Sequence, residues 1–166
     1  MSFFTEVKLV DKLTGAAAKI NAVGQIHTVA PLQQAIEDGA VFRAWGQGNP
    51  DVVLVVTPDV DTRISIEADV EQETLFQVYE TPDSVTGGAA FTPVNLNRAS
   101  AETFAGDVVV GATVDVTTAT LIDFKRLNAA TRYQADMVLL AETEYVIRTV
   151  CQITGNNEVN IRLLLW

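Results

Sequence analysis

Hydrophobic and polar residues alternate along much of the chain after residue 40, and this alternation predicts β-strands. The clearest case is the segment 63–70, where every second side chain is apolar: Ile64, Ile66, Ala68 and Val70. Successive side chains of a strand point to opposite faces, so this segment predicts a strand with one buried and one solvated face. The segment 52–56 is a continuous apolar run instead, which is typical of a strand buried on both faces.

Turn residues divide the rest of the chain into further strands. Eight strands are expected, at 41–45, 52–56, 63–70, 74–80, 107–116, 120–127, 145–152 and 158–166. Turns are expected at 46–50 and 154–157, and a loop at 81–90. No long helical pattern intervenes, which disfavours a parallel sheet with helical crossovers. Residues 40–166 are therefore predicted to form an all-β domain, an antiparallel β-sandwich of the jelly-roll type.

Residues 1–39 differ in character and are predicted to form an extended N-terminal arm. They are rich in small residues and contain no aromatic side chain after Phe4, so they bury little apolar surface alone. A short strand is expected around Val7–Val10. Pro31 and Gly39 are start and stop signals that predict a short helical turn near 32–38. We expect the order of the arm to depend on neighbouring molecules.

Composition narrows the class of protein. The 166 residues suffice for one domain with its own core, and the single cysteine, Cys151, makes a disulfide within the chain impossible. The net charge of −10 argues against binding bare nucleic acid, which requires clustered Lys and Arg. No apolar run reaches the ~18 residues of a membrane span, and Met1–Glu6 lacks the pattern of a secretory signal.

The sequence holds few candidates for catalysis. The only histidine, His27, lies in the arm and is expected to be an ordinary surface or interface residue, and Cys151 a small buried side chain. Glu67, Asp69 and Glu71 share one strand face at intervals of about 6–7 Å, a spacing that suits a glycosidase pair or calcium ligands. The same pattern is typical of a solvated outer face, which we prefer. The prediction is a protein that is not an enzyme, with no metal and no cofactor.

The expected last strand is apolar on both faces. One face carries Val159, Ile161, Leu163 and Leu165, while Leu164 and Trp166 lie on the other. Burial on both faces predicts that either the arm or a neighbouring subunit covers the second face.

Several short motifs follow one another in a characteristic order over residues 75–166. The first stretch holds Tyr79-Glu80, Gly87-Gly88 and Thr92-Pro93-Val94-Asn95-Leu96-Asn97-Arg98. The second holds Tyr145-Val146-Ile147-Arg148, the turn 154–157 and a closing strand ending at Trp166. This order resembles a family of small virion structural proteins of tailed bacteriophages. The chain departs from the family at 124–130, where members have a Gly-rich stretch, and residues before 40 have no counterpart.

The resemblance implies a capsid decoration or cement protein that stabilises the shell by bridging its subunits. The implied partners are the major capsid protein and copies of the chain itself, as a trimer, on the capsid surface of a virion assembled in the host cytoplasm. The interface candidates are Asn95, Asn97, Arg98, Arg148, Leu164 and Trp166. Asn95 and Asn97 suit hydrogen bonds to loop backbone, and the arginines suit Glu80 or a carboxylate across an interface, or merely solvate strand edges.

Two alternatives stay open at this point. In the first alternative, the protein is a tail, collar or head-fibre component of the particle, with a sandwich that binds carbohydrate. The third class, a glycosidase, depends only on the row Glu67, Asp69 and Glu71.

Overall fold

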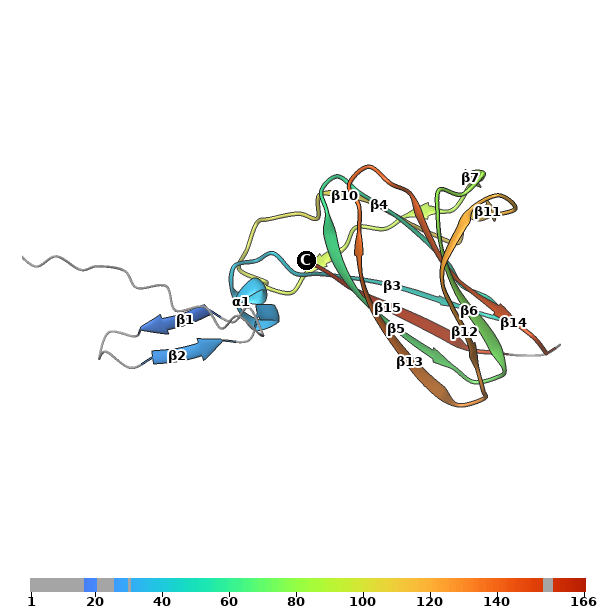
Figure 1. The fold of residues 1–166 in the computed structure, drawn as a ribbon, viewed down its shortest axis with the longest axis horizontal. Coiled ribbons are helices and arrows are strands. Elements are labelled where there is room, and N and C mark those ends of the chain that lie inside the picture. The colour runs from blue at the N-terminus through green and yellow to red at the C-terminus, as the bar shows by residue number, and fades with distance from the viewer. Residues whose placement is uncertain (1–16, 21–25, 30, 154–156) are drawn as a thin grey trace, which may run out of the picture.

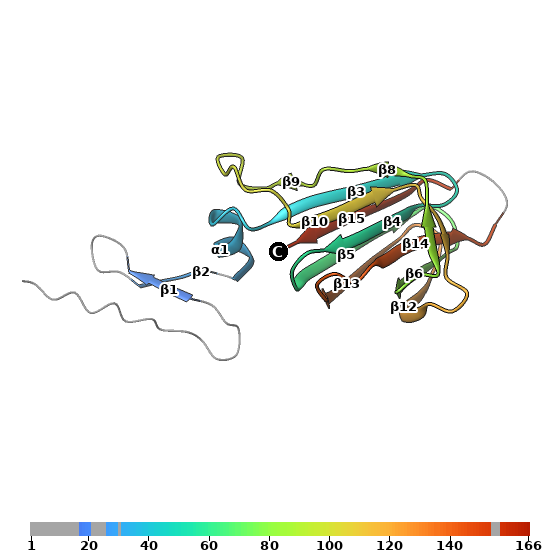
Figure 2. The ribbon, with the colours of Figure 1, turned by 90° about the horizontal axis from the view of Figure 1, so that it is seen from above.

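The computed structural model describes residues 17–20, 26–29, 31–153 and 157–166, and this part of the chain is nearly all-β. Two antiparallel sheets pack face to face, and a hairpin and one helix precede them (Figures 1 and 2). The predicted antiparallel β-sandwich is confirmed.

The first sheet has five strands. They are β3 (Phe42–Gly48), β5 (Thr62–Val70), β9 (Val94–Asn95), β13 (Thr131–Leu139) and β15 (Val159–Leu165). Across the sheet they follow the order β13-β5-β15-β3-β9, and every neighbouring pair is antiparallel. The last strand of the chain, β15, is therefore central, with Ile161 between Ala68 and Gly46.

The second sheet has six strands. They are β4 (Val53–Pro58), β6 (Thr74–Glu80), β8 (Ala89–Ala90), β10 (Gly106–Val110), β12 (Thr120–Leu127) and β14 (Tyr145–Cys151), in the order β12-β6-β14-β4-β10-β8. Two short strands, β7 (Ser84–Thr86) and β11 (Thr113–Asp115), form a separate two-stranded sheet. The chain crosses between the large sheets from β3 to β4, β5 and β6, and again from β12 to β13, β14 and β15.

The main core fills the space between the two large sheets. Every second residue of the predicted strand 63–70 contributes to it, with Ile64, Ile66 and Ala68 at 0% exposure and Val70 at 4%. The facing sheet contributes Leu54, Val56, Phe76, Val78, Val108, Tyr145 and Ile147. The alternation in the sequence thus marks the inward face of the sandwich.

A second, smaller cluster lies on the outer face of the six-stranded sheet. Val55, Tyr79 and Val146 pack there against Ala112 and against partly buried side chains of β7, β11 and their flanks. This cover explains why the run 52–56 is apolar on both faces, as predicted: Leu54 and Val56 face the core, and Val55 faces the second cluster.

The segment before the sandwich contains a hairpin and a helix. The hairpin pairs β1 (Ala17–Ile20) with β2 (Ile26–Val29), and α1 (Pro31–Glu37) follows where Pro31 and Gly39 predict a helical turn. Both views place the hairpin beyond α1, at the end of the sandwich where the C-terminus also lies (Figures 1 and 2). The strand expected at Val7–Val10 lies outside the described residues.

Two predictions about strand boundaries are wrong because of glycine. Residues 107–116 do not form one strand, since Gly111 adopts a φ of +73° and the chain leaves β10 there to enter β11 in another sheet. Gly46 and Gly48 were expected in a turn, but both belong to β3. A Cβ on Gly46 would lie 2.8 Å from a side-chain carbon of Val52, so glycine permits the close approach of these two segments of the chain.

Two other elements differ from the prediction. The segment 131–139 was not expected to be a strand, yet β13 is the edge strand of the five-stranded sheet. Its alternation is visible in the sequence, with Tyr133, Ala135, Met137 and Leu139 less exposed than the residues between them. The expected loop 81–90 contains the short strands β7 and β8.

Candidate functional site

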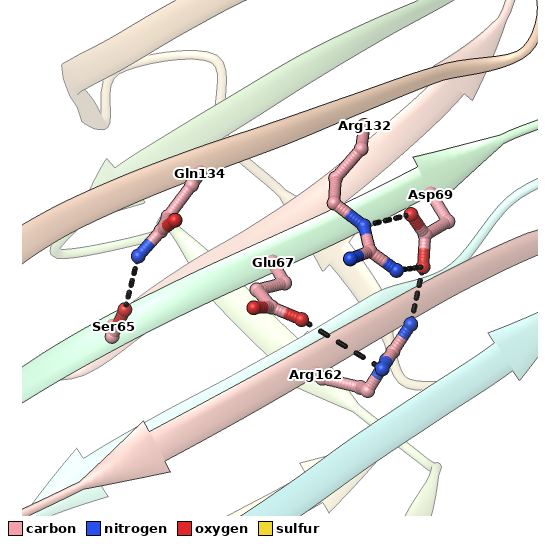
Figure 3. A network of polar contacts seen from close by, with 6 residues as sticks. All are labelled: Ser65, Glu67, Asp69, Arg132, Gln134 and Arg162. Carbon is pink, nitrogen blue, oxygen red and sulfur yellow. Dashed lines mark hydrogen bonds and ion pairs between the residues drawn. The ribbon is translucent and has the colours of Figure 1, made fainter.

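A network of charged side chains covers part of the outer face of the five-stranded sheet (Figure 3). Asp69 on β5 is its centre: Arg132 on β13 donates from Nε to Oδ1 at 2.8 Å, and Arg162 on β15 donates to Oδ2. Arg162 also lies 3.7 Å from Glu67, and Gln134 donates to the hydroxyl of Ser65 at 3.3 Å. Three neighbouring strands are thus linked by side chains on one face.

The surroundings of Asp69 keep this carboxylate ionised. The hydrogen bond from Arg132 is the main reason that the pKa of Asp69 lies below its usual value; partial burial opposes the shift and Arg162 adds to it. A catalytic acid needs the opposite shift, toward the pH at which it works. Glu67 and Asp69 therefore belong to a structural ion-pair network on a solvated face. Glu71 is exposed and lies outside this network.

An exposed aromatic side chain lies next to this network. Trp45 on β3 is 44% exposed and packs edge-to-face against Phe91, with ring centroids 4.7 Å apart. Register places Trp45 directly opposite Arg162. A small hollow of about 110 Å³ lies beside it, lined by Arg43, Ser65, Glu67, Arg162 and Leu164. Leu164 is half-buried on this polar face, so the second face of the last strand is only partly covered.

A larger, more apolar hollow of about 430 Å³ lies at the end of the sandwich near α1. Its apolar wall consists of Ala40, Phe42, Val60, Phe104, Ala105 and Trp166. Two carboxylates, Asp38 and Glu102, also line it. Trp166 therefore lies far along the chain from α1 but beside it in space (Figures 1 and 2).

Two of the predicted site residues fix the end of α1. Asn95 donates from Nδ2 to the carbonyl oxygen of Gly39 at 2.8 Å, and Asn97 donates from Nδ2 to that of Glu37 at 2.9 Å. The last carbonyls of a helix lack partners within the helix, and Asn97 supplies one for Glu37, while Asn95 binds the turn that follows α1. Asn95 and Asn97 thus hydrogen-bond backbone, as their type suggested, and their partners come from α1 as well as from their own loop.

The two candidate arginines lie apart. Arg98 is exposed in the loop after Asn97. Arg148 lies on the other sheet, where it donates to Oε1 of Gln77 at 2.9 Å and sits over the ring of Tyr79 at 5.0 Å. The suggested pairing of Arg148 with Glu80 is replaced by these contacts. The structure therefore groups Asn95, Asn97 and Trp166 at one end, and Leu164 and Arg148 on opposite outer faces.

Large apolar side chains remain exposed on β12, the edge strand of the six-stranded sheet. Phe124 is 50% exposed, Leu121 47% and Ile122 41%. The other exposed large apolar side chains of the described residues are scattered: Trp45, Val60, Val138, Leu140 and Ile153. β12 is therefore the one strand on which several of these side chains lie together, among the described residues.

Sequence reasoning missed both arginines of the charged network and the exposed apolar side chains of β12. The alternation of 131–139 was available as a signal for Arg132. The pairing itself was not, because the order of strands in the sheet, rather than local sequence, brings Arg132 and Arg162 to Asp69.

The remaining candidates contribute little chemistry. Cys151 is half-buried rather than buried, and its thiol donates to the carbonyl oxygen of Ile153 at 3.2 Å. His27 lies in β2, opposite Lys19. Across the described ranges, His, Cys, Asp and Glu do not gather in groups of three that suit a metal ion. None of the helices in that part of the chain is long and apolar enough to cross a membrane.

Comparison with known proteins identifies no relative. The chain matches no protein-family model, and searches among curated proteins and among solved structures find no match.

Proposed function

We propose that the protein is a structural component of a bacteriophage virion that decorates the capsid and stabilises it by bridging shell subunits. The observation that carries this proposal is the contrast between its polar and apolar surface groups. On the five-stranded sheet, Arg132 and Arg162 bind Asp69 and Glu67, while on the other sheet Phe124, Leu121 and Ile122 are left exposed. An exposed group of large apolar side chains is typical of a surface that another protein covers.

The order of the strands supports the jelly-roll part of the proposal. The eight long strands lie in the orders β3-β15-β5-β13 and β4-β14-β6-β12, one in each large sheet. Each sheet thus interleaves early and late strands of the chain, as two nested Greek keys do in a jelly roll. Jelly rolls are common in viral capsid proteins and in lectins, so this strand order suits the proposed role.

The segment before the sandwich supports a bridging role. A two-stranded hairpin is marginally stable in water alone, and β1 and β2 pair only with each other among the described strands. The amides of Asn95 and Asn97 hold the end of α1 against the sandwich. We propose that this attachment directs the arm toward neighbouring subunits, where the hairpin gains its cover, and that copies of the chain cluster on the shell as the predicted trimer.

The test is binding to purified, expanded phage shells. We expect the protein to cosediment with the shells and to raise the temperature at which they release DNA or break. Removing residues 1–30 should abolish or strongly weaken binding while the sandwich stays folded by circular dichroism. A protein that neither binds the shells nor changes their heat resistance would end the proposal.

One observation favours a second role, carbohydrate binding by a tail, collar or head-fibre component. Trp45 presents an exposed ring beside Arg162, Arg43 and Gln47 on a broad polar face. Aromatic rings that are apolar on one side and flanked by polar groups suit amphipathic ligands. A glycan array distinguishes the roles: binding that is lost in Trp45→Ala would favour this second function.

A further inference from the structure

The edge strand β12 has the features of a strand that pairs with a second molecule. It pairs with β6 on one side, and among the described residues no strand pairs with its other side. Its residues are exposed from Thr120 to Arg126 except for Asp123, which is half-buried. A long exposed edge strand with apolar side chains offers its free backbone groups to another strand.

The register of β12 with β6 shows which way its side chains point. Phe124 lies opposite Gln77, on the outer face of the sheet. Asp123 and Lys125 lie on the inward side of the strand, opposite Val78 and Phe76. A bulge at Ile122 interrupts the register, so the regular part of the strand runs from Asp123 to Leu127.

We infer that β12 pairs with β12 of a second copy, antiparallel and around a two-fold axis at Phe124. This arrangement places Asp123 opposite the partner's Lys125, and Lys125 opposite the partner's Asp123. It also brings Phe124 against the partner's Phe124, a favourable cross-strand aromatic pair. Shifting the axis by one residue would set Asp123 against Asp123 or Lys125 against Lys125, and like charges directly opposite are unfavourable. Charge therefore selects a second copy as the occupant and fixes the register.

The neighbouring groups fit this arrangement. Arg126 is bound to Glu73 of its own chain, with 2.6 Å between Nε and Oε1, and so does not compete for the partner's Asp123. Asp123 accepts a hydrogen bond from the Tyr133 hydroxyl at 3.0 Å through Oδ2, which leaves Oδ1 for Lys125. The bulge at Ile122 ends the ladder, and a two-fold contact uses each β12 once, so the pairing closes as a dimer rather than a fibre.

This inference deepens the proposed function, because it names a second contact between copies, one that forms in free solution and is separate from the contact at the arm, and it rests on the proposed self-association. The contact is short, so we expect a dimer that dissociates on dilution. A trimer needs a different contact, since a two-fold pairing of one edge joins two copies only.

Sedimentation velocity of the full chain over a concentration series tests the inference. We expect a monomer–dimer equilibrium for the wild type. Phe124→Thr should lower the association constant about tenfold or more, as loss of a central interface aromatic does. Val138→Thr, which changes an exposed apolar residue of the other edge strand, is the matched control and should leave association unchanged.

A charge exchange tests the register independently of folding. Lys125→Glu and Asp123→Lys should each be monomeric, because each sets like charges opposite one another twice. An equimolar mixture should recover dimers, since both pairs across the axis are then opposite in sign. Recovery also shows that each variant is folded.

Three results would overturn the inference: a wild type that is monomeric at every concentration, a trimer that Lys125→Glu leaves intact, or a mixture that stays monomeric. If the variants also bind phage shells normally in that case, the proposed function stands without this contact. Dimers that follow the charge exchange but never bind shells would uphold the inference and contradict the capsid role.

Discussion

The two edge strands β12 and β13 follow one another along the chain and lie at corresponding edges of the two sheets, yet their outward side chains are opposite in kind. On β13, Arg132 binds Asp69 and Gln134 binds Ser65, so two of its outward side chains have partners on the adjacent strand. On β12, Phe124 and Leu121 point outward and are about half exposed. Polar side chains of β13 thus have partners within the chain, whereas apolar side chains of β12 are left exposed.

The difference shows that two edge strands of one sandwich limit pairing with other molecules in different ways. Charged side chains and their partners make β13 unattractive to another strand. The bulge at Ile122 protects only one end of β12 and leaves a regular apolar segment after it. The surface of this sandwich is therefore asymmetric, with a polar face suited to water and an edge suited to protein.

We expect the strongest effect on stability from removing the packing between β13 and β6, the strand next to β12. Phe76 at 0% exposure packs against Tyr133 with ring centroids 5.0 Å apart, and so joins β6 to β13 across the core. Phe76→Ala should lower the free energy of unfolding by about 3–5 kcal/mol, measured by urea denaturation. Leu75→Ala, on the half-buried outer face of the same strand, should cost less than half as much. Equal losses would contradict this assignment of faces.

Replacing Asp69, the carboxylate that binds Arg132 of β13, should have a smaller effect on stability. Asp69 has a pKa below its usual value in the folded protein, so the folded state binds a proton less readily than the unfolded state. Its stabilisation is present above the unfolded pKa of about 3.9 and is lost as pH falls through the folded value. Asp69→Asn should therefore lower stability at neutral pH, by about 1 kcal/mol or less because the arginines are exposed, and the difference should vanish in acid.

Thermal unfolding from neutral to acidic pH checks this sign. Glu71→Gln, which changes an exposed carboxylate outside the network, is the control and should show no such convergence. A wild type that keeps its advantage over Asp69→Asn well below the folded pKa would show that the ion pairs do not stabilise β13.

The smallest effect concerns β12. Phe124→Thr keeps a residue that favours strands and removes an exposed ring, so the free energy of unfolding of the monomer should change by no more than about 0.5 kcal/mol. Urea denaturation at low concentration measures it. A loss of several kcal/mol would mean that Phe124 packs within the chain and is not an interface residue.

Much of the fold was predictable because burial repeats every second residue. Ile64, Ile66 and Ala68 mark the core face of β5 from sequence alone. The strand pairing was not predictable, since nothing local indicates that β15 lies between β5 and β3. Glycine also has two structural roles here that the sequence alone does not distinguish. Gly111 ends a strand, whereas Gly46 lies within a strand and permits the close approach of Val52.

The candidate sites were less predictable than the fold for the same reason. Asn95 and Asn97 were recognisable as residues that bind backbone, but their partners in α1 and the turn after it lie far back in the chain, 56 residues for Asn95 and Gly39 and 60 for Asn97 and Glu37. Asp69 looked like a member of a carboxylate row until β13 and β15 brought Arg132 and Arg162 beside it. Phe124 read as an ordinary strand residue, because exposure depends on which strand ends the sheet.

Hydrogen–deuterium exchange, read segment by segment in dilute free protein and in the associated or shell-bound form, shows whether β12 is the interface. We expect the amides of Thr120–Leu127 to gain protection on association, while those of Thr131–Leu139 change little. Protection that appears along β13 and its polar face but not along β12, or on neither edge, would contradict this expectation.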